Sequence, residues 1–151
     1  MNNRIGWTDI PDGVRAALDR AEALGTGPYT LQAAIAACHA RAAGAGETDW
    51  RRIVALYTVL QHLLPSPVVA LNRAVAVGMA QGPAAGLSIV DELAHDPQLK
   101  DYYLLPSVRG DLLARLGRHD EASAEFTRAA GLTRNDRERA LLLARADNPS
   151  T

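Results

Sequence analysis

Hydrophobic residues recur at spacings of three and four along most of the 151-residue chain, and Gly and Pro separate these stretches. Such spacing places apolar side chains on one face of an α-helix. No stretch alternates between apolar and polar residues for long enough to predict a strand. The pattern predicts helices at about residues 11–25, 29–43, 49–64, 67–80, 83–94, 102–116, 120–130 and 136–146.

Short motifs mark where several of these helices begin. Thr48 and Asp49 precede one apolar repeat, with a hydroxyl to cap the helix and a carboxylate to meet its positive dipole end, and Ser66 precedes the next repeat as an N-cap. Pro67 suits a first helical position, because the N–H that proline lacks would have no partner there. Pro106 is tolerable only in the first turn of its helix, so the start near residue 102 is the least defined boundary.

The composition favours the same fold class. The chain contains 28 Ala and 20 Leu but only 14 Val and Ile together. Ala and Leu are strong helix formers, whereas strands are rich in β-branched and aromatic residues. We therefore expect an all-α protein, and its many small side chains should let helices pack closely.

An internal repeat indicates how the helices are paired. Residues 71–93 align with residues 107–129 at an offset of 36, and small residues fall on small ones and bulky residues on bulky ones. The aligned pairs are Ala74 with Gly110, Val77 with Leu113, Gly86 with Ala122, and Val90 with Phe126. We expect an antiparallel array of helix hairpins over residues 10–146, between a tail or expression remnant at residues 1–9 and a tail at residues 147–151.

Charge and cysteine content exclude several classes of function. The 16 basic and 17 acidic residues give a net charge of −1, without the positive excess that binds nucleic acid or anionic membranes. The single cysteine, Cys38, excludes an intramolecular disulfide and a multi-thiolate zinc site. Without a signal peptide or a long apolar span, the chain is expected to be cytoplasmic.

The residues provide no convincing catalytic centre. Cys38 and His39 are adjacent, so on a helix their side chains point about 100° apart and cannot hold one ion together. The acidic pairs at residues 91–92 and 120–121 stand apart from any His or Ser that could complete an acid–base set. We predict no catalytic residue, no metal, no cofactor and no enzymatic activity.

Two helices carry candidate partner-binding residues. Gln32 and His39 lie seven positions apart, on one helix face. His39 has either a structural or surface role, or it lines a polar groove together with Gln32. Asp49 and Trp50 open the third helix, with Tyr57 on the same face as Trp50. There Asp49 and Trp50 are either a cap and a core anchor, or an exposed Trp that docks a peptide.

A polar pair, Asn72 and Arg73, interrupts an otherwise apolar helix. Such groups need partners, because an unpaired buried guanidinium is costly. They either hydrogen-bond to neighbouring turns, or Arg73 points into a concave groove and meets a carboxylate of a partner. The arginines of the last helix, offset by Asp136 and Glu138, favour a solvated capping face.

Residues 116–122 (LGRHDEA), followed by Phe126 and Ala129, resemble the second half of a tetratricopeptide repeat. Gly110 fits the small position of that repeat's first helix. The proline that usually follows the second helix is absent, because Arg134 lies near that place.

A longer series resembles the C-terminal extension of one group of extracytoplasmic-function (ECF) sigma factors of bacterial RNA polymerase. The similarity extends over roughly residues 10–146 and is carried by residues 27–40, 48–50, 53–57, 65–77 and 82–87. It implies a tetratricopeptide-like right-handed superhelix of about seven to eight helices. The chain contains neither the promoter-reading helix-turn-helix nor the promoter-melting helix of those factors, so we expect it to be a C-terminal fragment.

This resemblance implies a regulatory protein-interaction domain. Its partner would be the sigma core domains, RNA polymerase or a regulatory protein, with no direct binding of nucleic acid or membrane. Terminal Ala-rich helices could also pair in a homodimer. The alternative is a small-molecule sensor with a pocket near Trp50 and Tyr57, which would relay a signal to the sigma domains.

Overall fold

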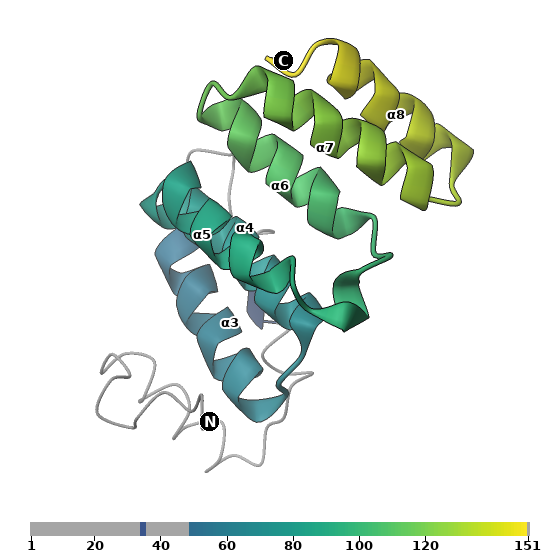
Figure 1. Cartoon of the computed structure of the whole chain (residues 1–151). Coiled ribbons are helices and arrows are strands. Elements are labelled where there is room, and N and C mark those ends of the chain that lie inside the picture. Colours follow the sequence, from purple (N-terminus) through teal and green to yellow (C-terminus); the bar gives the residue numbers. More distant parts are fainter. Residues whose placement is uncertain (1–33, 36–48, 151) are drawn as a thin grey trace.

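The computed structural model describes residues 34–35 and 49–150 (Figure 1). These residues form helices and connecting turns and contain no strand, which confirms the all-α prediction for this part of the chain. The helices are α3 (Trp50–Leu63), α4 (Pro67–Gln81), α5 (Pro83–Leu93), the short 3₁₀ helix η3 (Pro97–Leu99), α6 (Leu104–Arg115), α7 (His119–Leu132) and α8 (Asp136–Asp147). The helices predicted at residues 11–25 and 29–43 lie outside the described residues, except for helical residues 34–35.

The helix starts follow the signals in the sequence. The Asp49 side chain accepts a hydrogen bond from the Arg52 N–H at 3.1 Å, and Ser66 accepts one from the Val69 N–H at 3.5 Å. Helix α6 begins at Leu104, which places Pro106 in its first turn. The helix η3 was not predicted, because a single 3₁₀ turn is too short to leave a periodic pattern.

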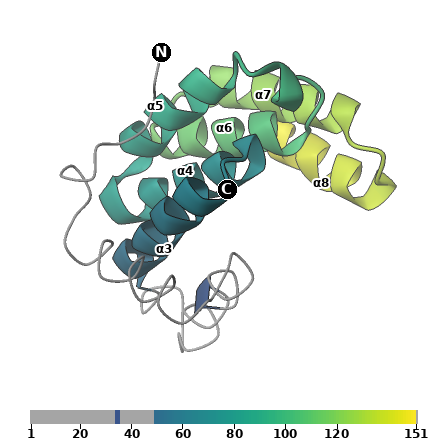
Figure 2. The ribbon, with the colours of Figure 1, turned by 90° about the horizontal axis from the view of Figure 1, so that it is seen from below.

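Each described α-helix packs against the next α-helix along the chain, and α4 also contacts α6 and η3. Figure 2 shows α5 and α7 along the upper edge of the molecule, α4 and α8 below them, and α6 between these two sets of helices. Helices α5 and α7 thus lie on the opposite side from α4 and α8. Short turns join α4 to α5, α6 to α7 and α7 to α8, whereas residues 94–103, which contain η3, join α5 to α6. Gly82, between α4 and α5, adopts a φ of 105° that favours glycine.

The buried side chains form two clusters. The larger one joins helices α4 to α8 through side chains that include Leu71, Leu113 and Phe126. The smaller one joins α3 and α4 with Ile35. Helix α4 contributes to both clusters, so it connects the two parts of the described core.

The 36-residue offset relates equivalent positions of two helix hairpins, α4–α5 and α6–α7. The eight residues of the four aligned pairs named above are all buried. In the first hairpin, the backbones approach so closely that a Cβ on Gly86 would lie 2.9 Å from the Ala74 carbonyl oxygen. The repeat seen in the sequence thus marks positions where helices meet.

Arginine side chains tie neighbouring helices together. Arg109 on α6 bonds Asp91 on α5 at 2.9 Å and reaches Glu125 on α7 at 3.5 Å. Arg139 on α8 donates to the carbonyl oxygens of Ala130 and Thr133 at the end of α7. The last helix is therefore fixed to α7 by its charged residues as well as by apolar packing.

Candidate interaction surface

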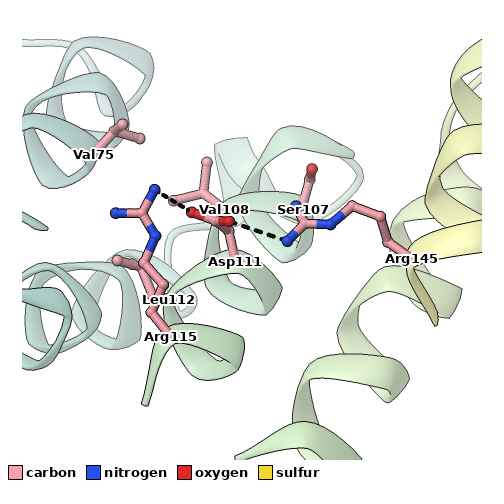
Figure 3. Close-up of a pocket in the computed structure, with 7 residues that line it drawn as sticks. All are labelled: Val75, Ser107, Val108, Asp111, Leu112, Arg115 and Arg145. Carbon is pink, nitrogen blue, oxygen red and sulfur yellow. Dashed lines mark hydrogen bonds and ion pairs between the residues drawn. The ribbon is translucent and has the colours of Figure 1, made fainter. Parts of the chain in front are cut away.

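Helices α4, α6 and α8 border a hollow with a volume of about 230 Å³ (Figure 3). These three helices are not consecutive in the chain, since α5 and α7 lie between them. Most of the lining side chains come from α6, which forms the floor between the other two helices. The lining residues are Val75, Ser107, Val108, Asp111, Leu112, Arg115 and Arg145.

Asp111 is the charged centre of the hollow. Its two carboxylate oxygens bind different arginines, Arg115 on its own helix and Arg145 on α8, each at 3.2 Å. In Figure 3 the two guanidinium groups approach Asp111 from opposite sides. Two positive charges thus share one negative charge, which leaves an excess of one positive charge among the lining residues.

The two arginines differ in their other contacts. The guanidinium of Arg145 also lies over the ring of Phe126, 4.4 Å from its centroid, where a cation–π contact holds it against the core. The Nη1 of Arg115 instead donates to the sulfur of Met79 on α4 at 2.7 Å. Because a thioether is a weak acceptor, the Nη1 of Arg115 has no strong hydrogen-bond acceptor among the described residues.

An apolar stripe on α4 adjoins the hollow. Val68, Val75 and Met79 are 41%, 37% and 37% exposed, and their spacing of seven and four residues places them on one helix face. Asn72 lies on the same face and is exposed. The surface over α4 and α6 therefore combines exposed aliphatic side chains with two arginines and one aspartate.

The candidate residues on α3 have structural roles in the described part of the chain. Asp49 is exposed and caps α3, while Trp50 and Tyr57 are half-buried and pack against the cluster around Ile53. Burial raises the pKa of the Tyr57 phenol. This geometry agrees with the interpretation of Asp49 and Trp50 as a cap and a core anchor.

Asn72 and Arg73 point in different directions. The Nε of Arg73 donates to the Thr58 hydroxyl on α3 at 3.0 Å, and half-burial lowers the pKa of the guanidinium. Among the described residues no carboxylate forms an ion pair with Arg73. Arg73 thus forms a hydrogen bond within the protein, as in the first of the two interpretations. It does not line the hollow.

The remaining candidates, Gln32 and His39, and the neighbouring Cys38, lie outside the described residues. The hollow contains none of the five candidates that are described, and sequence reasoning missed Asp111 and Arg115. The 36-residue offset pairs Asp111 with Val75 and Arg115 with Met79, which places them at equivalent helix positions but does not mark them as a charged site. Of the arginines at the last helix, Arg134 and Arg137 are exposed, whereas Arg139 and Arg145 are partly exposed and also bond to other parts of the protein.

Within residues 34–35 and 49–150, no three His, Cys, Asp or Glu side chains come close enough to hold a metal ion. In the same residues, no helix has the length and the apolar character needed to cross a membrane. The charged groups of the hollow are therefore its two arginines and Asp111, which lie among aliphatic side chains.

No protein-family model matches the chain. No solved structure matches it either. The chain is similar to the uncharacterized protein R00370 of Rhizobium meliloti (strain 1021), with 48% identity over 122 residues. The match includes 81% of this chain but 28% of the relative, so the chain spans less than a third of that protein's length.

Proposed function

We propose that the chain is a regulatory protein-interaction domain of an ECF-type RNA polymerase sigma factor. It would modulate transcription initiation through contacts with the sigma core domains, the polymerase or a regulatory protein. The resemblance of residues 10–146 to the extension of such factors supports this proposal. The length of the relative supports it too, because the matching region there is one part of a longer protein.

The observation that carries the proposal is the hollow between α4, α6 and α8. In an array of helix hairpins, every second helix lines the same side, and the concave side presents a continuous surface to a partner. The proposed arrangement is a right-handed, tetratricopeptide-like superhelix, in which α4, α6 and α8 form the inner layer. The exposed stripe of Val68, Val75 and Met79 would then face the bound partner.

The size of the hollow favours a polypeptide partner over a small molecule. Pockets for small ligands typically measure about 300–1,000 Å³ and enclose most of the ligand. The volume here, about 230 Å³, is smaller, and it continues into an exposed aliphatic stripe. A peptide or helix gains affinity from such a surface by placing a few side chains in it and covering the rest.

A binding measurement on the 151-residue chain tests the proposal. The chain is immobilised, and RNA polymerase core enzyme and the two conserved domains of an ECF sigma factor are added separately. We expect one of them to bind with a Kd on the order of micromolar. Absence of binding to both, together with unchanged transcription when the matching region is deleted from a full-length factor, would contradict the proposal.

A matched pair of variants tests where the partner binds. Val75→Asp places a charge in the hollow, whereas Ser88→Asp places the same charge on an exposed position of α5. We expect Val75→Asp to weaken binding about tenfold or more, because it puts a carboxylate into the apolar stripe. Equal affinities for the two variants would place the binding site elsewhere on the molecule.

A further inference from the structure

We propose that the Nη1 of Arg115 binds a carboxylate of the partner. When no partner is bound, the same nitrogen contacts the sulfur of Met79. The bound segment is a polypeptide with an acidic side chain next to aliphatic ones. This inference rests on the proposed function, since it specifies the chemistry of the partner at the same surface.

The contacts of Arg115 point to an incompletely used guanidinium. Its Nη2 bonds Asp111 at 3.2 Å, but among the described residues its Nη1 has no hydrogen-bond partner besides the sulfur of Met79, at 2.7 Å. The side chain is 42% exposed, so a partner can reach it. A carboxylate forms a charge-assisted hydrogen bond with a guanidinium, which is much stronger than a contact with a thioether.

The balance of charge allows Arg115 to accept a second anion. Asp111 keeps its bond to Arg145 whether or not Arg115 turns toward a partner. Arg145 is in turn held by the ring of Phe126. An incoming carboxylate would therefore balance the excess positive charge without leaving Asp111 unpaired.

The residues beside Arg115 determine which kind of molecule fits. Val75 and Met79 are exposed aliphatic side chains, and covering them with apolar groups is favourable. A nucleic-acid backbone would place charged phosphates against this stripe and would meet only two arginines, one of them already held in place. A peptide with Asp or Glu next to Leu, Ile or Val satisfies both parts of the surface.

Peptide display provides the test, because the partner's sequence is unknown. Random peptides of about twelve residues, or roughly three helical turns, are selected on the immobilised chain. We expect the enriched peptides to carry Asp or Glu close to an aliphatic residue. The same selection on Arg115→Gln should lose these sequences, and Arg128→Gln, which removes an exposed arginine from α7, should retain them.

Two substitutions at Met79 sharpen the test. Met79→Leu keeps an apolar side chain but removes the sulfur, so the selected acidic peptide should bind as well as before or better. Met79→Glu supplies Arg115 with a carboxylate from the protein itself, and it should weaken binding of that peptide at least tenfold. Circular dichroism confirms that both variants keep their helical content.

The outcomes separate this inference from the proposed function. Acid-rich peptides that depend on Arg115 support the inference, even if neither polymerase nor sigma domains bind. Enriched peptides without acidic residues, equal selection by Arg115→Gln, or no enrichment would overturn it, while binding of polymerase or sigma domains would still stand. Arg115-dependent binding of labelled duplex DNA, or Arg115-dependent dimerisation in light scattering, would overturn it as well.

Discussion

Phe126 occupies the space that a side chain on Gly110 would need. A Cβ built on Gly110 would lie 2.8 Å from Cε1 and 2.9 Å from Cδ1 of the ring, and the ring is completely buried. The equivalent pair in the preceding hairpin is Ala74 and Val90, a larger residue on one helix and a smaller one on the other. When the side chain on the first helix of the hairpin is smaller, the side chain that packs against it from the second helix is thus larger.

This relationship predicts that Gly110→Ala destabilises the protein. The new methyl group would overlap a buried ring, and overpacking of this kind costs about 1–3 kcal/mol. Urea unfolding followed by circular dichroism measures the loss. Shortening the ring with Phe126→Leu should reduce the cost of Gly110→Ala, and equal costs in both backgrounds would contradict the proposed overlap.

Gly131 provides the matched control for that experiment. It lies on the same hairpin, in α7, but a Cβ built there would meet nothing within 4 Å. Gly131→Ala should therefore stabilise the protein by about 0.5–1 kcal/mol, because alanine loses less entropy than glycine in a helix. A destabilising result would show that more than local space decides the effect of a glycine substitution here.

Gly86→Ala should be more harmful than Gly110→Ala. Its Cβ would lie 2.9 Å from the Ala74 carbonyl oxygen and 3.0 Å from the Gly78 Cα, and both atoms belong to the backbone of α4. A backbone cannot rotate away as a side chain does, so the axes of α4 and α5 must separate. Thermal unfolding should show a lower midpoint than for Gly110→Ala, whereas Ser88→Ala at an exposed position of α5 should change it little.

Thr58→Val tests the hydrogen bond of Arg73. The substitution keeps the shape of the side chain but removes the acceptor of the half-buried guanidinium, which should cost about 1–3 kcal/mol. In the background Arg73→Met, the same change should cost less, because no charge remains to be satisfied. Urea unfolding of the four proteins measures the difference, and identical costs would show that Thr58 contributes nothing through Arg73.

Alkaline pH should reveal the contact between Tyr103 and Glu138. A hydrogen bond to the Glu138 carboxylate raises the pKa of the Tyr103 phenol above its ordinary value of 10.0. The folded state therefore holds the proton more tightly than the unfolded state. This contribution to stability is complete below about pH 10 and is lost as the pH rises through the folded-state pKa.

Glu138→Gln should accordingly lower the pKa of Tyr103 toward 10, as measured by tyrosinate absorbance. Tyr103→Phe should make stability fall less steeply with pH above about 10. Tyr102→Phe, at the adjacent position, keeps Glu138 and removes only the smaller charge effect of Tyr102 on Tyr103, so it should change the slope less than Tyr103→Phe does. An unchanged slope in Tyr103→Phe would show that the hydrogen bond has no effect on folding.

The helices of the described region were predictable because their signals are local. Asp49 and Ser66 cap the helices that follow them, and Pro106 restricts where α6 can begin. The 36-residue offset also located buried contacts such as that of Gly110 with Phe126, since each hairpin repeats the packing of the other. These features depend on neighbours along the chain or on a repeat that the sequence displays.

The hollow could not be located in the same way, because it depends on how the hairpins are placed side by side. Asp111 and Arg145 are 34 residues apart on different helices, and no local pattern pairs them. In the sequence, Asn72 and Arg73 form one polar pair within an apolar helix. Adjacent residues on a helix point about 100° apart, however, so Arg73 faces α3 while Asn72 is exposed.

The double attachment of Arg109 has a consequence for the seam between the two hairpins. Its guanidinium holds one carboxylate on each side, Asp91 from the first hairpin and Glu125 from the second. Dissolved salt screens such attractions where water reaches them, and half of the Asp91 side chain is accessible. Raising the ionic strength should therefore weaken the attachment of α6 to α5 at this seam.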